Sequence, residues 1–200
     1  LLSSGMSNWK ELDKAVNTIQ KFHNNITVLQ CTSEYPSTHE NVGLNIMQEM
    51  KKRYQLPVGL SDHTLTNYSA FTAVALGASF IEKHLTFSSK MYGSDAKHSV
   101  EPSEFSDMVK GIRAIETIVS SKLDKDEIAN RMGKMKEVFQ KSIVSVVDIP
   151  KGAVISEGMI GFKKPGTGIP ASKVETVLGM RSRRIIPKDK IVKIKDLKNV

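Results

Sequence analysis

The sequence contains a single cysteine, few aromatic residues (6%) and no long uninterrupted hydrophobic run. With Cys31 alone, the chain cannot build an internal disulfide framework or a cysteine-rich zinc site, and a cytoplasmic location is expected. No segment approaches the roughly 18 consecutive apolar residues that a membrane helix needs, so no transmembrane span is expected. The first residues also lack the basic and apolar regions of a secretory leader. Because the chain opens on Leu1, directly in an apolar run, we expect it to be part of something longer.

The charge is unevenly distributed over a chain of otherwise ordinary globular composition, 40% hydrophobic and 25% charged. Residues 121–200 contain 18 Lys and Arg against 9 Asp and Glu, whereas residues 1–120 contain 11 against 12. A basic second part is compatible with nucleic acid, an acidic membrane or a small anionic substrate. Only two aromatic residues, Phe139 and Phe162, accompany these charges. The lack of stacking aromatics argues against nucleic acid, and we expect neither a nucleic-acid nor a membrane partner.

Short apolar runs alternate with segments of helical spacing over residues 1–122. The expected strands cover residues 1–6, 26–33, 57–64 and 79–87, and the expected helices cover 9–22, with Ser7 as N-cap, 44–54, 68–76 and about 102–121. Four β-α units are typical of a parallel sheet with helical crossovers. They make up half of the ~250 residues of a closed (β/α)8 barrel, so the pattern predicts an open doubly wound sheet or the second half of a TIM barrel. With only Gly5 after the first strand, a dinucleotide site is disfavoured.

The remainder of the chain has a different character. Residues 123–139 lack a strong apolar period and are interpreted as a linker with some helical character. Residues 140–200 consist of short apolar strands broken by Pro, Gly and Lys, which predicts a small β-rich domain. A weak repeat relates residues 149–155 to residues 186–192, each a proline turn that leads into a strand. A domain of about 60 residues buries little surface by itself, so we expect it to lean on another domain or subunit.

Two histidines form the sharpest candidate site. His63 and His84 are 21 residues apart, one helix-plus-strand unit, and each ends an expected strand. Neighbouring parallel strands lie ~4.8 Å apart, so two imidazoles at equal depth can converge on one divalent cation. Two histidines hydrogen-bonded at strand ends, or one acting as a general base, are the alternatives. Period-2 alternation puts Ser61 on the face of His63 and Glu82 on that of His84, and we count Glu82 as a catalytic candidate with the histidines.

Other polar residues at the same strand ends suggest substrate contacts. The hydroxyls of Ser3, Ser4, Ser33 and Ser61 lie near expected helix starts, where a phosphate can be held. Helix capping by these side chains is the alternative. The loop of residues 91–102 follows the fourth strand, and its Asp95 could accept hydrogen bonds from a hydroxylated substrate unless the loop is only a solvated turn.

Six ordered motifs carry a resemblance to the sialic acid synthase family, the N-acetylneuraminate synthases and their legionaminate and pseudaminate relatives. They are Leu2–Ser7, Cys31–Pro36, Gly59–Thr64, Ile81–Thr86, Gly93–Asp95 with Glu101–Pro102, and Lys164–Ile169. The resemblance spans essentially the whole chain. It implies strands five to eight of a (β/α)8 barrel, followed by an antifreeze-like domain of the SAF type. It also implies a transferase that condenses phosphoenolpyruvate with an N-acetylated hexosamine, releasing phosphate and a nine-carbon 2-keto acid.

The resemblance also assigns roles by position. It implies that His63 and His84 hold a divalent metal, usually Mn²⁺, that Ser3 and Ser61 contact the phosphate of phosphoenolpyruvate, and that Tyr35 and Asp95 contact the amino sugar. A domain-swapped homodimer would bring the C-terminal domain to the active site of a second subunit. Lys164 stands where many members have an arginine, so the charge is kept but the bidentate fork is lost.

The resemblance leaves two other functions as alternatives. One is another phosphoenolpyruvate-dependent aldol synthase on the same barrel, which the appended β domain disfavours. The other is a non-catalytic carbohydrate-binding protein, which would not depend on a metal. The family also carries phosphate-binding lysines on its first four strands, before the position of Leu1, so we expect this piece alone to be inactive.

Overall fold

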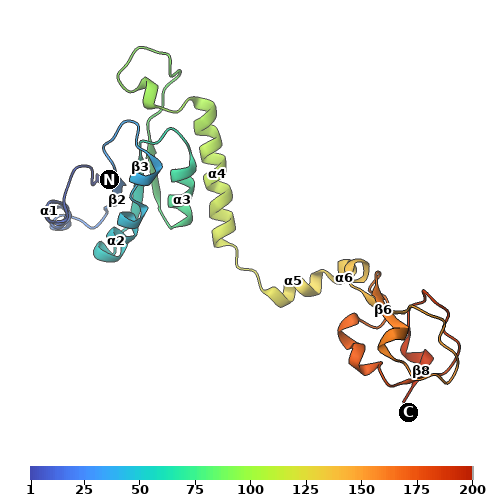
Figure 1. Cartoon of the computed structure of the whole chain (residues 1–200). Helices are drawn as coiled ribbons and strands as arrows, with labels where there is room; N and C mark the ends of the chain where they lie inside the picture. The colour runs from blue at the N-terminus through green and yellow to red at the C-terminus, as the bar shows by residue number, and fades with distance from the viewer. Residues whose placement is uncertain (200) are drawn as a thin grey trace. The chain divides into compact units, whose positions relative to one another are not determined.

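The computed structural model describes residues 1–199, which form two compact units, Leu1–Lys122 and a second unit that begins at Leu123 (Figure 1). Residues 123–139, interpreted as a linker, fold into two short helices that are grouped with the second unit. No helix among residues 1–199 is long and apolar enough to cross a membrane.

The first unit contains a four-stranded parallel sheet with helices between its strands. Its strands are β1 (Leu2–Ser3), β2 (Val28–Cys31), β3 (Val58–Asp62) and β4 (Phe80–Lys83), in the spatial order β1-β2-β3-β4. Its helices are α1 (Trp9–Gln20), α2 (Leu44–Tyr54), α3 (Tyr68–Ala75) and α4 (Pro102–Ser120), with short 3-10 turns η1 (His39–Asn41) and η2 (Ala96–His98). A doubly wound sheet reverses its strand order at a switch point. The four described strands run in chain order, as in a barrel.

The observed strands are shorter than the expected ones at both ends. Another difference concerns the cap of α1, which is Asn8 and not Ser7. The Asn8 side chain accepts a hydrogen bond from the Glu11 N–H, and the Glu11 carboxylate accepts one from the Asn8 N–H, both at 3.0 Å. This reciprocal capping box satisfies two N–H groups that the helix itself leaves free.

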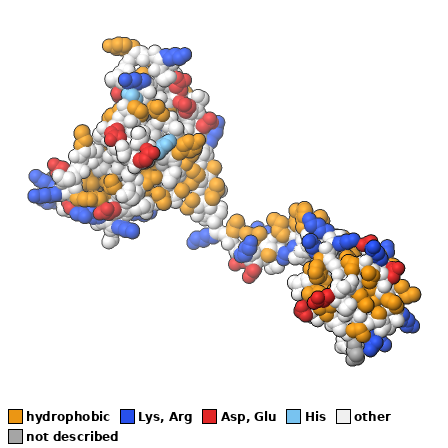
Figure 2. Space-filling model, viewed as in Figure 1, with side chains coloured by type: hydrophobic (Ala, Val, Ile, Leu, Met, Phe, Trp, Pro, Cys, Tyr) orange, Lys and Arg blue, Asp and Glu red, His pale blue; other side chains and the backbone are white. Residues whose placement is uncertain are grey.

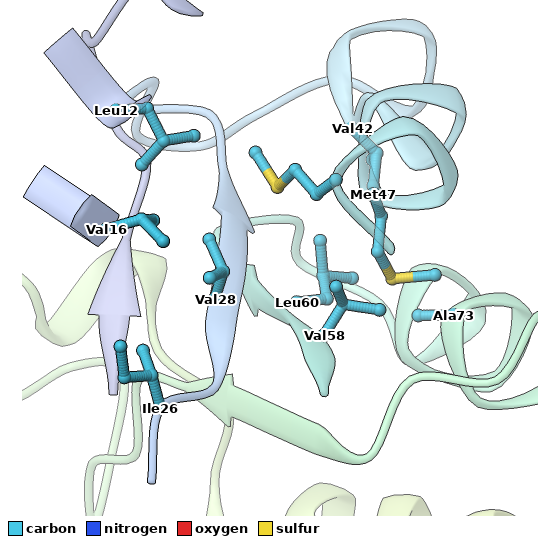
Figure 3. Close-up of a cluster of buried hydrophobic side chains, with 10 residues drawn as sticks. Leu12, Val16, Ile26, Val28, Val42, Met47, Val58, Leu60 and Ala73 are labelled. Carbon is cyan, nitrogen blue, oxygen red and sulfur yellow. The ribbon is translucent and has the colours of Figure 1, made fainter. Parts of the chain in front are cut away.

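The core of the first unit lies between the sheet and its helices. Figure 3 shows the side chains of one cluster directed toward one another from α1, β2, β3, α2 and α3. Val28, Val58 and Leu60 are at most 1% exposed in this cluster, so they mark the helix-facing side of β2 and β3. Because successive side chains alternate between the two faces, Cys31, Ser61 and Glu82 lie in one row on the opposite face.

The second unit is built from helices α5 (Lys125–Arg131) and α6 (Gly133–Phe139) and from two small antiparallel sheets. β5 (Ser142–Ser145) pairs with β6 (Ile160–Lys163), and β7 (Arg181–Ser182) pairs with β8 (Leu197–Lys198). The 3-10 turns η3 (Glu157–Met159), η4 (Ala171–Thr176) and η5 (Ile194–Asp196) connect them. A separate cluster of buried aliphatic side chains fills this unit. On the face seen in Figure 2, Lys and Arg are interspersed with hydrophobic and acidic side chains.

The repeat predicted in this unit has a structural counterpart. Ile149 and Ile186, its first residues, exchange two backbone hydrogen bonds of 2.8 and 2.9 Å. The hydroxyl of Ser145 donates to the carbonyl of Pro187, and that of Ser182 donates to the carbonyl of Pro150. Each serine lies four residues before its own copy, so the two copies brace each other through equivalent bonds.

Candidate active site

The two histidines lie directly beyond the carboxyl ends of neighbouring strands, His63 after β3 and His84 after β4. Their ring centroids are 5.2 Å apart and their planes meet at 85°. The Nδ1 atom of His63 lies 2.8 Å from the carbonyl oxygen of Thr32. Because a carbonyl only accepts, Nδ1 carries the hydrogen, and neutral His63 keeps its lone pair on Nε2. The rings therefore meet as the strand spacing predicts, with a nitrogen of His63 free to coordinate.

Ser61 of β3 and Glu82 of β4 each lie two residues before a histidine, on the same face of the sheet. They are register partners on the face opposite the helices, and the Ser61 hydroxyl donates a 2.7 Å hydrogen bond to Oε1 of Glu82. This bond confirms the predicted alternation, which placed both residues on the face of the histidines. It also occupies the Ser61 hydrogen, so a phosphate oxygen would have to compete with Glu82 for it.

Tyr35 and Asp95 reach the two histidines from the loops that follow β2 and β4. The ring of Tyr35 lies 4.2 Å from that of His63 and 5.7 Å from that of His84, centroid to centroid, and the tyrosine is 50% exposed. An oxygen of Asp95 lies 3.7 Å from Nδ1 of His84. The histidines are thus bordered by the apolar ring of Tyr35 and by the Asp95 carboxylate, a hydrogen-bond acceptor.

The segment that carries Asp95 is fastened where it meets α4. The backbone N–H and the hydroxyl of Ser89 both donate to Glu101, at 2.8 and 3.0 Å. These bonds hold the pKa of the Glu101 carboxyl below its ordinary value. Glu101 also forms a capping box with Glu104 at the start of α4. The two ends of the loop are therefore joined at Glu101, the N-cap of α4.

The serines at the ends of β1 and β2 have surroundings of their own. Ser4 is buried, and its hydroxyl donates to Gln30 and accepts from the Cys31 N–H. Ser4 and Ser33 line a cavity of about 450 Å³ that does not include either histidine. Ser3 is exposed at the end of β1. The Ser4 hydroxyl thus joins the ends of β1 and β2, while the Ser33 hydroxyl lies 3.9 Å from Sγ of Cys31.

Lys164 lies in the second unit, in a loop shaped by a buried serine. Its Nζ atom sits 4.8 Å from the centre of the Phe139 ring. The Ser142 hydroxyl donates to the carbonyl of Pro165 and accepts from the N–H of Gly168 at 2.8 Å. A side chain at Gly168 would overlap Ile191, so the loop can pass this closely only with glycine.

Sequence reasoning gave no role to Asp62 and Lys83, the residues just before the two histidines. On the helix-facing side of the sheet they form an ion pair of 2.7 Å, and their side chains are 1% and 2% exposed. Lys83 also donates to the carbonyls of Thr64 and Thr66. Asp62 accepts from Ser69 of α3 at 2.6 Å.

The donor set of the site fits a divalent cation that completes its coordination with water and substrate oxygens. Within residues 1–199, no cluster of three or more His, Cys, Asp or Glu side chains could enclose a metal ion. Two imidazoles supply at most two of the four to six ligands that Zn²⁺, Mn²⁺ or Fe²⁺ takes. Such a site would be open, as Lewis-acid catalysis requires.

Comparisons with known proteins identify the family of the chain. Residues 1–124 match the model of the NeuB family, and residues 140–198 match the SAF domain. The chain belongs to the NeuB family. Its fold is therefore the C-terminal half of a (β/α)8 barrel followed by a SAF domain, and the choice between a barrel and a doubly wound sheet is settled.

Several relatives of this NeuB-family chain are named as synthases of legionaminic or sialic acids. An N,N'-diacetyllegionaminic acid synthase of Campylobacter jejuni is 37% identical over 96% of this chain and 58% of its own length. The human N-acetylneuraminate-9-phosphate synthase is 31% identical over 90% of this chain and 50% of its own. A solved N-acetylneuraminic acid synthetase of Leptospira borgpetersenii is 33% identical, with a TM-score of 0.60 over 66% of this chain and 48% of that one. The chain spans between half and three fifths of these curated relatives.

Proposed function

We propose that the protein carrying this chain condenses phosphoenolpyruvate with an N-acetylated hexosamine and releases phosphate and a nine-carbon 2-keto acid. The observation that carries the proposal is the meeting of His63 and His84 at 5.2 Å on neighbouring strand ends, in a chain of the NeuB family. The legionaminic acid synthases, at 37% and 35% identity, favour a 2,4-diacetamido sugar over N-acetylmannosamine as acceptor.

His63 and His84 would hold the divalent cation, with Mn²⁺ as our choice. When bound, the cation supplies Lewis-acid polarisation of the aldehyde of the open-chain sugar. The chain's own residues bring the two substrates together, which converts a bimolecular encounter into an oriented one. Carbon 3 of phosphoenolpyruvate then attacks the aldehyde carbon, water adds at carbon 2, and phosphate leaves by cleavage of the C–O bond.

The remaining side chains hold substrates and protons. Tyr35 offers its ring to the sugar, and Asp95 accepts hydrogen bonds from sugar hydroxyls. Glu82, which already accepts the Ser61 hydrogen, is positioned to hold or pass a proton beside the histidines. Ser3 and Ser61 are assigned to the phosphate group, with Ser4 and Ser33 as neighbouring hydroxyls.

In this proposal the protein works as a domain-swapped homodimer, and Lys164 of one subunit serves the sugar site of the other. A lysine provides a point charge where an arginine would provide a fork. Replacing Lys164 by alanine should then raise the KM for the sugar more than that for phosphoenolpyruvate. Lys163, which is paired with Asp189, offers a matched control in the next position.

The deciding experiment measures phosphate release from phosphoenolpyruvate by the complete protein, with N-acetylmannosamine or a 2,4-diacetamido sugar, with and without Mn²⁺. Mn²⁺-dependent release that requires one of these sugars supports the proposal. Release with a phosphorylated aldose instead would identify another aldol synthase of the same barrel. Sugar binding without phosphate release under any condition would point to a carbohydrate-binding protein.

A further inference from the structure

The residues that precede the two histidines form a charged pair of their own. Asp62 and Lys83 are register partners of β3 and β4, one residue before His63 and His84. Because side chains alternate along a strand, this pair lies on the helix-facing side while the imidazoles lie on the other. This ion pair thus connects the same two strands that carry the histidines, on the opposite face of the sheet.

Burying this ion pair costs desolvation free energy, so its contribution is sought in geometry and not in stability. Both side chains are at most 2% exposed, and removing two charges from water offsets most of their attraction. Replacing such a pair by neutral groups is often harmless to stability, and its best-attested use is to fix one register among several. The pair is therefore weak as a source of stability and well suited to align two strands.

The bonds around the pair extend to the backbone that follows His63. Lys83 Nζ donates to Asp62 at 2.7 Å and to the carbonyls of Thr64 and Thr66 at 2.6 and 3.0 Å. The Asp62 carboxylate accepts from the Thr64 N–H at 3.0 Å. All three donors of the ammonium are used, and two of them hold the loop that immediately follows the histidine.

We propose that Asp62 and Lys83 are positioning residues, which lock β3 and β4 in register so that the imidazoles of His63 and His84 face one another at equal depth. The proposal rests on the proposed function where it concerns a cation. Its geometric content, the orientation of the His63 ring toward Thr32, stands independently of any metal.

The test compares the double variant Asp62→Asn/Lys83→Met with the wild type in the complete protein. Both substitutions are close in shape and leave no buried charge unpaired. The first measurement is the dissociation constant for Mn²⁺ alone, which we expect to rise roughly 10- to 100-fold, as when groups that orient metal ligands are removed. The second is the Nδ1–H signal of His63 in ¹⁵N-histidine spectra of the metal-free protein, which we expect to be lost or shifted.

Ser69→Ala is the matched control, because it removes the contacts of the Ser69 hydroxyl with Asp62 and with the Thr64 hydroxyl and leaves the ion pair in place. Its Mn²⁺ affinity should stay within about twofold of the wild type, since the histidines are not displaced. A folded double variant with unchanged Mn²⁺ affinity and an unchanged His63 signal would overturn the proposal.

Lys83→Arg covers the case in which the double variant does not fold. It keeps the charge beside Asp62 but cannot place three donors on one nitrogen, so we expect a folded protein with weakened Mn²⁺ binding and a shifted His63 signal. No change in either would equally overturn the proposal. If the wild type binds no Mn²⁺, the metal role in the proposed function fails, and the His63 signal of the metal-free variants still decides the positioning role.

Discussion

His63 donates a 2.8 Å hydrogen bond from Nδ1 to the carbonyl oxygen of Thr32, on the neighbouring strand end. The bond fixes the tautomer of the imidazole and turns its unprotonated nitrogen away from Thr32. Groups that orient a histidine in this way are a regular part of metal sites. In the proposed function, this bond would orient His63 as a ligand before any cation binds.

Replacing His63 or His84 by alanine should abolish Mn²⁺-stimulated phosphate release while leaving the protein folded. Each substitution removes one of the two imidazole nitrogens, and the remaining histidine cannot hold the cation at micromolar concentrations. The measurement is an Mn²⁺ titration of turnover in the complete protein. His23→Ala is the control, because His23 is exposed beyond the end of α1. Titration curves that coincide with the wild type would refute the ligand assignment.

Glu82→Gln should lower kcat by roughly 100- to 10,000-fold, the usual contribution of a positioned acid or base. The amide keeps the shape and can still accept the Ser61 hydrogen bond, so the loss would report on proton handling. Glu116→Gln, on the exposed surface of α4, is the matched control. A Glu82→Gln variant with wild-type kcat and a raised KM for phosphoenolpyruvate would place this residue in binding instead.

The sequence predicted the fold and the site geometry to different extents. The alternation of strands and helices predicted all four parallel strands and placed His63 and His84 together, because both periodicities are local. The partner of His63 is a backbone carbonyl, which carries no side-chain signal. The pairing of Asp62 with Lys83 does have a sequence signal, because the two opposite charges have the same 21-residue spacing as the histidines and fall on the other face. In the second unit the repeat was visible, but the crossed serine bonds depend on how its copies fold against each other.

Asp13→Asn should lower the melting temperature near neutral pH, and the difference from the wild type should vanish in acid. Arg53 and Tyr54 donate hydrogen bonds to Asp13, which hold the pKa of its carboxyl below the ordinary value of 3.8. A carboxyl whose pKa is depressed on folding stabilises the protein above its unfolded pKa, and this contribution is lost as the pH falls through the lower, folded value. Thermal unfolding at several pH values measures the effect.

The control for that series is Asp107→Asn, because Asp107 forms only an exposed ion pair with Lys110 within α4. Pairs of this kind contribute little to stability. An Asp13→Asn variant that melts at the wild-type temperature throughout the range from pH 7 to about pH 4 would show that the cluster around Arg53 does not stabilise the first unit.

Gly168→Ala should destabilise the SAF domain by about 1–3 kcal/mol, the usual cost of forcing extra volume into a packed site. An added Cβ would overlap Ile191 and lie 3.1 Å from Cβ of Ser142, whose hydroxyl shapes the Lys164 loop. Hydrogen exchange of residues 140–198 in the complete protein measures the local loss of protection. Gly158→Ala is the control, since nothing lies within 4 Å of a Cβ built there. Equal protection in both variants would mean that the loop accommodates the added Cβ without a loss of local stability. Because the loop carries Lys164, a displaced loop should also raise the KM for the sugar, which ties the packing of this small domain to the proposed reaction.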